Sequence, residues 1–237
     1  MLINNPILYE CISEIRYPSQ FIYYNERYNV CNEIQKKLPN WKVDIGKIIL
    51  NDLSNQKESR ISNFVFTNKG ASLNTKNLKT YENFKSLAIF VFQKVISGLN
   101  ITKIDRIGIR SFLIFQSDSD FNELKDFLFG KLFNVEIKKN NIFGEITDIA
   151  YIVNSKKYNS DLRIAIGPLT KSELKTKYIY DDNNVSEASI LLDIDYFNLN
   201  MSNNLNAHIK HMLKENANIL EDIESNLLSY FNKGEVK

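Results

Sequence analysis

The sequence predicts an α+β protein in which helices flank runs of strands joined by short turns. Segments of alternating apolar and polar residues mark the strands, and apolar stripes at helical spacing mark four helices. The order strand, helix, several strands, helix occurs twice, and short turns favour antiparallel pairing. We therefore expect two pseudo-repeats, about 1–100 and 101–237, which share one core in a single compact unit over 1–237.

The first half opens with an alternating strand over residues 7–17, which ends at Pro18. Its apolar side is expected to hold Ile7, Tyr9, Cys11 and Ile15, and its polar side Glu10, Glu14 and Arg16. A helix over 25–38 follows, and then strands across 41–53, 60–67 and 71–78. The next helix, over 81–99, is apolar around most of its circumference, so we expect it to be buried.

The second half repeats this order, with a strand over 103–116 and a helix over 120–133. Asp120 fits the capping position of that helix. Further strands are predicted at 142–154, 162–167, 174–180 and 189–199. A long C-terminal helix over 205–231 closes the chain, with one apolar stripe along its length.

The composition excludes several classes of protein. Lys and Arg number 30 against 28 Asp and Glu, a net charge of +2, so nucleic-acid binding is not expected. Two cysteines, Cys11 and Cys31, form no disulfide framework and indicate a reducing compartment. The sequence contains no signal-peptide pattern and no apolar run of about 18 residues, so we expect a cytoplasmic protein without membrane contact. Its glycines form no phosphate-binding loop, and no cofactor is expected.

Three stretches together resemble a sporadically distributed, uncharacterised bacterial protein family. They are Asn-Pro-Ile-Leu-Tyr-Glu at 5–10 with Glu-Ile-Arg-Tyr-Pro at 14–18, Asp-Arg-Ile-Gly-Ile-Arg at 105–110, and Leu-Leu-Asp-Ile-Asp-Tyr-Phe at 191–197. The chain departs from the family after Arg110, where Ser111 stands in place of an aromatic residue followed by Asn. The resemblance implies no activity. The sporadic distribution of the family implies an accessory gene, for example in phage defence or a toxin–antitoxin pair.

Charged residues alternate along the same three stretches, which places each set on one side of its strand. If the strands are neighbours, the charged residues share one face: Glu14, Arg16, Arg106, Arg110, Asp193 and Asp195. One interpretation is a structural network of cross-strand ion pairs. The other is a ligand-binding pocket, in which the arginines bind a phosphate or carboxylate or the aspartates hold a divalent metal.

Two other patterns are weaker candidates for chemistry. His208 and His211 lie near the start of the last predicted helix, and their helical positions favour solvent exposure over metal binding. Residues 136–138, Glu-Ile-Lys, match the Glu-x-Lys of metal-dependent nucleases. The matching upstream aspartate would be Asp118, Asp120 or Asp126.

The sequence therefore favours a non-enzymatic binding or regulatory protein that acts through a protein partner or a small anionic ligand. The alternative is a metal-dependent hydrolase or nuclease, which requires carboxylates that converge without arginine partners. A third interpretation is a structural subunit, including a homo-oligomer, which requires an exposed apolar patch of several hundred Å². No residue is predicted to be catalytic or to bind a metal in the favoured interpretation.

Overall fold

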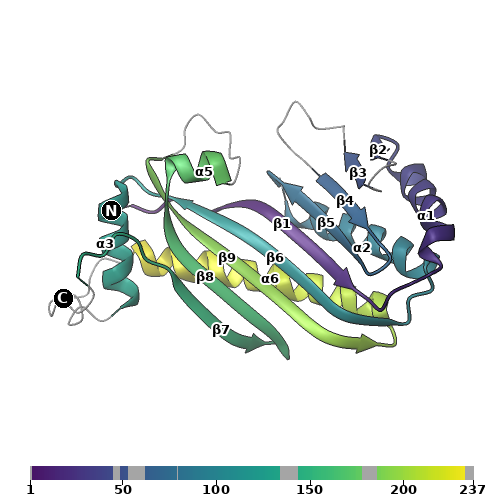
Figure 1. Cartoon of the computed structure of the whole chain (residues 1–237). Coiled ribbons are helices and arrows are strands. Elements are labelled where there is room, and N and C mark those ends of the chain that lie inside the picture. The colour runs from purple at the N-terminus through teal and green to yellow at the C-terminus, as the bar shows by residue number, and fades with distance from the viewer. Residues whose placement is uncertain are drawn as a thin grey trace.

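The structure is a computed structural model that describes residues 2–44, 49–52, 62–78, 80–133, 144–177 and 186–232. In these ranges nine strands form one antiparallel sheet with the order β2-β3-β4-β5-β1-β6-β9-β8-β7 (Figure 1). The strands are β1 (Ile7–Arg16), β2 (Trp41–Asp44), β3 (Ile49–Asp52), β4 (Ser62–Phe66), β5 (Gly70–Lys76), β6 (Lys103–Gln116), β7 (Tyr151–Lys157), β8 (Ser160–Thr170) and β9 (Ala188–Ser202). The helices are α1 (Tyr23–Lys37), α2 (Tyr81–Gly98), α3 (Phe121–Leu132), α5 (Lys171–Lys177) and α6 (Leu205–Asn232). The predicted α+β class, the antiparallel sheet and the long C-terminal helix are confirmed.

The centre of the sheet is the pair β1 and β6, which are far apart in sequence. Beyond β1 lie β5, β4, β3 and β2, and beyond β6 lie β9, β8 and β7. Strands from the first hundred residues thus occupy one side of the sheet and later strands the other. This order makes β1, β6 and β9 direct neighbours, so the three charged strands of the sequence lie side by side.

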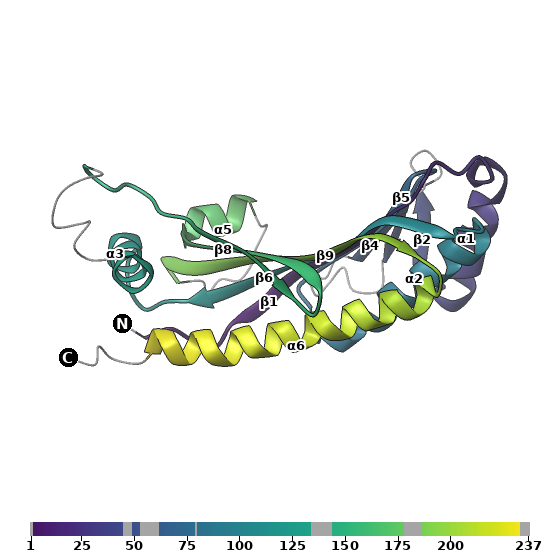
Figure 2. The ribbon, with the colours of Figure 1, turned by 90° about the horizontal axis from the view of Figure 1, so that it is seen from below.

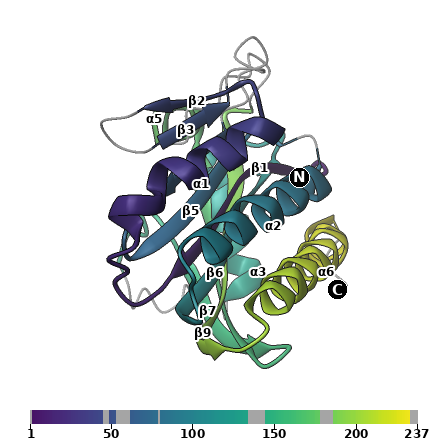
Figure 3. The same cartoon turned by 90° about the vertical axis from the view of Figure 1, so that its right-hand side faces the viewer.

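Helices cover one face of this sheet much more than the other. Helix α6 runs along the sheet beside α2, and α1 packs on α2 (Figures 2 and 3). Helix α3 closes the end of the same core, where the ring of Phe127 lies 6.2 Å from that of Phe231 in α6. The short α5 lies on the opposite side of the sheet (Figure 2). We call the face opposite α6 the open face.

The main core forms because the alternating strands and the helical stripes place their apolar residues on the same layer. Residues such as Ile15, Leu73 and Ile109 are fully buried against the helices. Most of the predicted stripe of the last helix is buried in α6, and its members Ile223 and Leu227 are partly buried. Among the described residues, no helix combines the length and the apolar character needed to cross a bilayer.

Buried polar contacts fix α6 on the sheet. The hydroxyl of Tyr196 in β9 donates to Glu215 in α6 at 2.6 Å. The side-chain amide of Asn216 donates to the hydroxyls of Tyr81 at 3.0 Å and Ser111 at 3.3 Å. Because the polar groups inside the core must find partners there, these bonds select one position of α6 along the sheet.

The predicted alternation of the first strand is wrong at its start. The pairing register between β1 and β6 shifts between Leu8 and Glu10, which is the signature of a β-bulge. Tyr9 therefore belongs to a second, small cluster on the open face, beneath Leu174 of α5, whereas Cys11 lies in the main core. One extra residue inverts the sides of the strand, and an alternation pattern does not reveal it.

Three predicted strands also need correction. The stretch 174–180 begins as helix α5, and its residues 178–180 lie outside the described part of the chain. Strand β7 begins only at Tyr151, because the described residues 144–150 form no strand. The stretch 41–53 holds two strands, β2 and β3, which pair with each other. The predicted cap is confirmed, since Asp120 accepts a hydrogen bond from the amide of Glu123 at 2.9 Å.

Candidate functional site

The open face brings together the six charged residues that the sequence singled out. Within β1, β6 and β9 their positions alternate with core residues, so all six project from the same face. The registers place Arg16 beside Arg106, and Arg110 beside Asp195. We call Glu14, Arg16, Arg106, Arg110, Asp193 and Asp195 the arginine cluster.

Arg106 is the central member of the cluster, because it lies on β6 and bridges the neighbouring strands β1 and β9. Its Nη2 donates to both carboxylate oxygens of Asp195 in β9, each at 3.1 Å. Its Nη1 donates to Oε2 of Glu14 in β1 at 3.4 Å. A guanidinium can hold two carboxylates in this way because its five N–H donors lie in one plane.

The other two arginines each bind one carboxylate through two hydrogen bonds. Arg16 donates to Glu14 at 2.8 and 3.0 Å, and this contact raises the pKa of the Arg16 guanidinium. Arg110 donates to Asp193 at 2.7 and 2.6 Å. The Arg110 side chain is 48% exposed, whereas that of Asp193 is 13% exposed. Each carboxylate of the cluster thus has an arginine partner.

Gly108 makes the central bridge sterically feasible. In the sheet Gly108 stands between Glu14 of β1 and Phe197 of β9. A Cβ at this position would lie 2.8 Å from Cζ of Arg106 and still closer to Nη1. The guanidinium therefore occupies the space of the missing side chain, where it also lies 4.8 Å from the centre of the Phe197 ring. That contact adds a cation–π attraction to the ion pairs.

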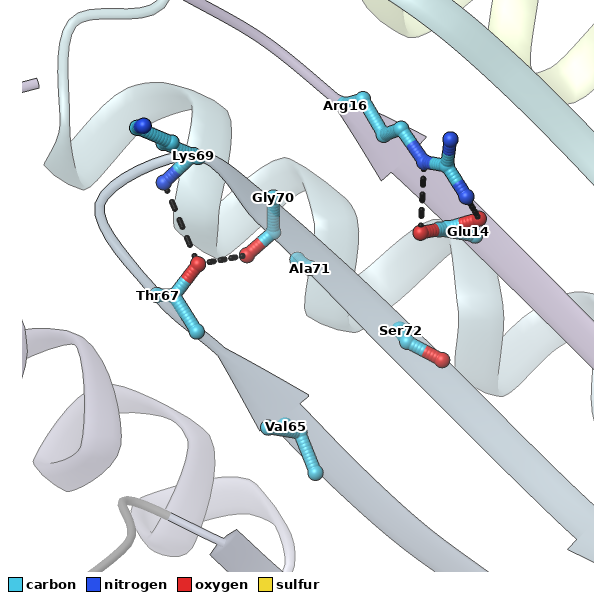
Figure 4. Close-up of a pocket in the computed structure, with 8 residues that line it drawn as sticks. All are labelled: Glu14, Arg16, Val65, Thr67, Lys69, Gly70, Ala71 and Ser72. Atoms are coloured by element: carbon cyan, nitrogen blue, oxygen red, sulfur yellow. Dashed lines mark hydrogen bonds and ion pairs between the residues drawn. The ribbon is translucent and has the colours of Figure 1, made fainter. Parts of the chain in front are cut away.

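An open pocket of about 370 Å³ borders the cluster at the turn between β4 and β5 (Figure 4). It is lined by Glu14, Arg16, Val65, Thr67, Lys69, Gly70, Ala71 and Ser72. The turn is ordered by Thr67, whose hydroxyl accepts a hydrogen bond from the amide of Lys69 at 3.1 Å. Lys69 has no ion-pair partner in the part of the chain that the structure describes. The pocket thus combines two exposed cations, two hydroxyls and a small apolar floor.

Sequence reasoning missed the contribution of this turn. Lys69 and Gly70 lie between the predicted strands 60–67 and 71–78, and their distance in sequence from Arg16 hides the contact. The signal that could have found them is the glycine. A Cβ on Gly70 would lie 2.9 Å from the carbonyl oxygen of Ile15, so only glycine lets β5 approach β1 here without displacement.

A row of side chains, all polar except Ile12, crosses the open face and passes through the cluster. In register across the sheet stand Asn51, Asn63, Asn74, Ile12, Arg110, Asp195, Arg163 and Asn154. Arg163 has no ion pair with another described residue. The sequence alone does not predict this row, because alternation gives the side of each strand but not the register between strands.

The patterns associated with metals find less support. His208 and His211 are both exposed on α6, and His211 Nδ1 lies 3.2 Å from Glu215. Asp118 accepts a hydrogen bond from the amide of Leu2, and Asp120 caps α3, which gives both a structural role. The Glu-x-Lys at 136–138 lies outside the described residues. The described residues hold no group of three or more His, Cys, Asp or Glu side chains suited to a metal ion.

The predicted site residues therefore lie together, and their role in ligand binding stays a prediction. Comparison of the chain with protein-family models and with curated proteins gives no match. The function must accordingly be argued from the arginine cluster and its pocket.

Proposed function

We propose that the protein is a non-enzymatic binding protein whose open face takes an anionic group in the pocket beside Arg16 and Lys69. The ligand class is a carboxylate or phosphate, on a small molecule or on a protein partner. Arginine and lysine side chains next to hydroxyls are the groups that proteins use for such anions.

The observation that carries the proposal is the charge of the pocket. Two cations, Arg16 and Lys69, line the pocket, against one carboxylate, that of Glu14. Glu14 also forms an ion pair with Arg106, so its charge is shared between two guanidiniums. The pocket therefore has an excess of positive charge that a ligand anion would balance.

The same geometry argues against the metal-dependent hydrolase or nuclease. A metal site needs carboxylate oxygens that are available to the ion. Here Glu14, Asp193 and Asp195 are each held by arginine. An increase in melting temperature on addition of Mg²⁺ or Mn²⁺ would favour the enzyme instead.

We also infer that the two halves of the chain are pseudo-repeats. Counted outward from the centre, one half of the sheet contains β1, β5, β4 and β3, and the other contains β6, β9, β8 and β7. In both halves the central strand comes first in the chain and the strand beside it comes last of the four. In each half a helix follows the central strand, and another follows its neighbour in the sheet, α1 and α2 against α3 and α6.

The binding proposal can be tested by isothermal titration calorimetry with inorganic phosphate and with acetate. We expect at least one of them to bind, and Arg16→Gln or Lys69→Ala to weaken its affinity about tenfold, which corresponds to about 1.4 kcal/mol. Lys156→Ala is the matched control, because Lys156 is an exposed cation on β7, the edge strand at the other end of the same sheet. The control should bind as the wild type does. Failure of both anions to bind, or equal losses in all three variants, would contradict the proposal.

A further inference from the structure

The sheet registers place Arg16 and Arg110 at matching positions of the two central strands. Glu14 of β1 is paired with Gly108 of β6. Arg16 lies two residues after Glu14, and Arg110 lies two residues after Gly108. Both side chains project from the open face. The surroundings of the two arginines can therefore be compared position by position.

The strands that flank the two arginines, β9 beside Arg110 and β5 beside Arg16, differ in the side chains that they place next to the guanidinium. Next to Arg110, β9 continues through Asp195 to Asp193, whose carboxylate accepts two hydrogen bonds from the guanidinium. Next to Arg16, β5 begins only at Gly70, and the residues before it form the turn from β4. The position opposite Arg110 thus holds Asp195, whereas the position opposite Arg16 holds Gly70, which has no side chain and lines the open pocket.

Arg16 can exchange its partner without leaving a carboxylate unpaired. The Arg16 side chain is 58% exposed, and exposed ion pairs contribute little to stability. Glu14 keeps a second cation, because Nη1 of Arg106 lies 3.4 Å from its Oε2. An incoming carboxylate therefore competes with Glu14 for Arg16 at small cost.

An exposed aromatic surface follows directly on the strand that carries Arg16. Phe21 is 87% exposed and Tyr24 is 56% exposed, and they lie three residues apart where α1 begins. The backbone that leads to them is joined to the β4–β5 turn, since the amide of Gln20 donates to the carbonyl of Asn68 at 2.8 Å. Aromatic residues are enriched in protein–protein interfaces, and here the backbone just before them is bonded to the turn that forms one wall of the cationic pocket.

We propose that the anionic group is a carboxylate carried by an acidic peptide segment of a partner protein, and that an apolar side chain of the same segment packs on Phe21 and Tyr24. The inference rests on the proposed anion-binding function and names its ligand. The chain itself supplies the precedent, because Asp193 binds Arg110 through two hydrogen bonds at the matching position. Charge complementarity selects the acidic residue, and the exposed rings select its apolar neighbour.

The test is a selection from a displayed library of random peptides on the wild-type chain. We expect enrichment of peptides in which Asp or Glu stands near a large apolar residue. A synthetic copy of the strongest binder should bind about tenfold more weakly to the Arg16→Gln chain, and about threefold more weakly to the Phe21→Ser chain. Replacing its acidic residue by the amide should cost about tenfold as well. Ile152→Ser is the matched control, since Ile152 is a half-exposed apolar residue on β7.

Inorganic phosphate and acetate separate this inference from the anion-binding function. If either anion needs Arg16 while no acidic peptide is enriched, the peptide inference is wrong and the anion-binding function stands. Enriched peptides without an acidic residue, or with equal affinity for the Arg16→Gln chain, overturn the inference in the same way. If neither anion nor any peptide depends on Arg16, both proposals fail.

Discussion

The guanidinium of Arg106 lies over a residue that has no side chain, and this arrangement holds the arginine cluster together. Gly108 leaves the space, Phe197 supplies an aromatic surface, and carboxylates from two different strands supply the charge. The sequence could predict which charged residues share one side of each strand, because alternation along a strand is local. It could not predict the role of Gly108, which depends on its exact neighbours in β1 and β9.

Gly108→Val should therefore destabilise the fold by about 1–2 kcal/mol, although valine suits a strand better than glycine. The new side chain would displace the Arg106 guanidinium and break both of its ion pairs. Urea unfolding measures the change. Gly130→Ala is the matched control, because a Cβ at Gly130 in α3 meets nothing within 4 Å, and it should stabilise by about 0.5–1 kcal/mol. A Gly108→Val chain more stable than the wild type would refute this role of the glycine.

Arg110→Ala tests the second pair of the cluster. A fully buried pair would lose about 3–5 kcal/mol, but the Arg110 side chain is half exposed, so we expect about 1–3 kcal/mol. The loss arises because Asp193, which is mostly buried, loses both hydrogen bonds from this guanidinium. Arg163→Ala should change the unfolding free energy by less than about 0.5 kcal/mol, since Arg163 makes no ion pair with a described residue. Equal effects of the two substitutions would show that the Arg110 pair contributes nothing specific.

At the scale of elements, apolar periodicity predicted the helices well because each stripe has to face the sheet. It failed where a single residue changes the phase of a strand, as at the bulge before Glu10. It also failed for α5, a helix of seven residues that buries Leu174 and is too short to show a helical period.

The bond between Tyr196 and Glu215 is the clearest test of how α6 is attached. Tyr196→Phe removes the hydroxyl that donates to Glu215, a residue that is 8% exposed, and we expect a loss of about 1–3 kcal/mol in urea unfolding. Tyr230→Phe is the control, because its hydroxyl also donates one bond, to the carbonyl of Lys131, but on the surface. It should cost less than about 0.5 kcal/mol. Similar losses for both would mean that burial of the contact does not matter.

At the scale of the whole molecule, the sequence predicted most of the elements and their order along the chain. It did not predict that β1 and β6 meet at the centre of one sheet, because strand pairing over about a hundred residues leaves no local signal. That pairing decides the site, since it brings Arg16 and Arg106 together and places both beside β9.

The buried ionisable groups predict a loss of stability at alkaline pH. Burial raises the pKa of Cys31 to about 11 and that of Cys11 to about 12, and it raises the pKa of Tyr17, Tyr81 and Tyr196. A raised pKa in the folded state gives stability that is complete below the ordinary value, 9.0 for a thiol. That stability is lost as the pH rises toward the folded value. Urea unfolding should give a constant free energy from about pH 7 to 8 and a steady decrease above about pH 9. A constant value through about pH 10.5 would be inconsistent with buried thiols.

The most direct test of the central claim is nitrogen-15 NMR of the arginine Nε–H groups and the backbone amides during a titration with acetate and then phosphate. If the pocket binds anions, the signals of Arg16, Thr67, Lys69 and Gly70 should move together and saturate, while that of Arg106 stays nearly fixed. Saturating shifts elsewhere on the sheet with Arg16 unchanged, or no saturating shift with either anion, would contradict the claim.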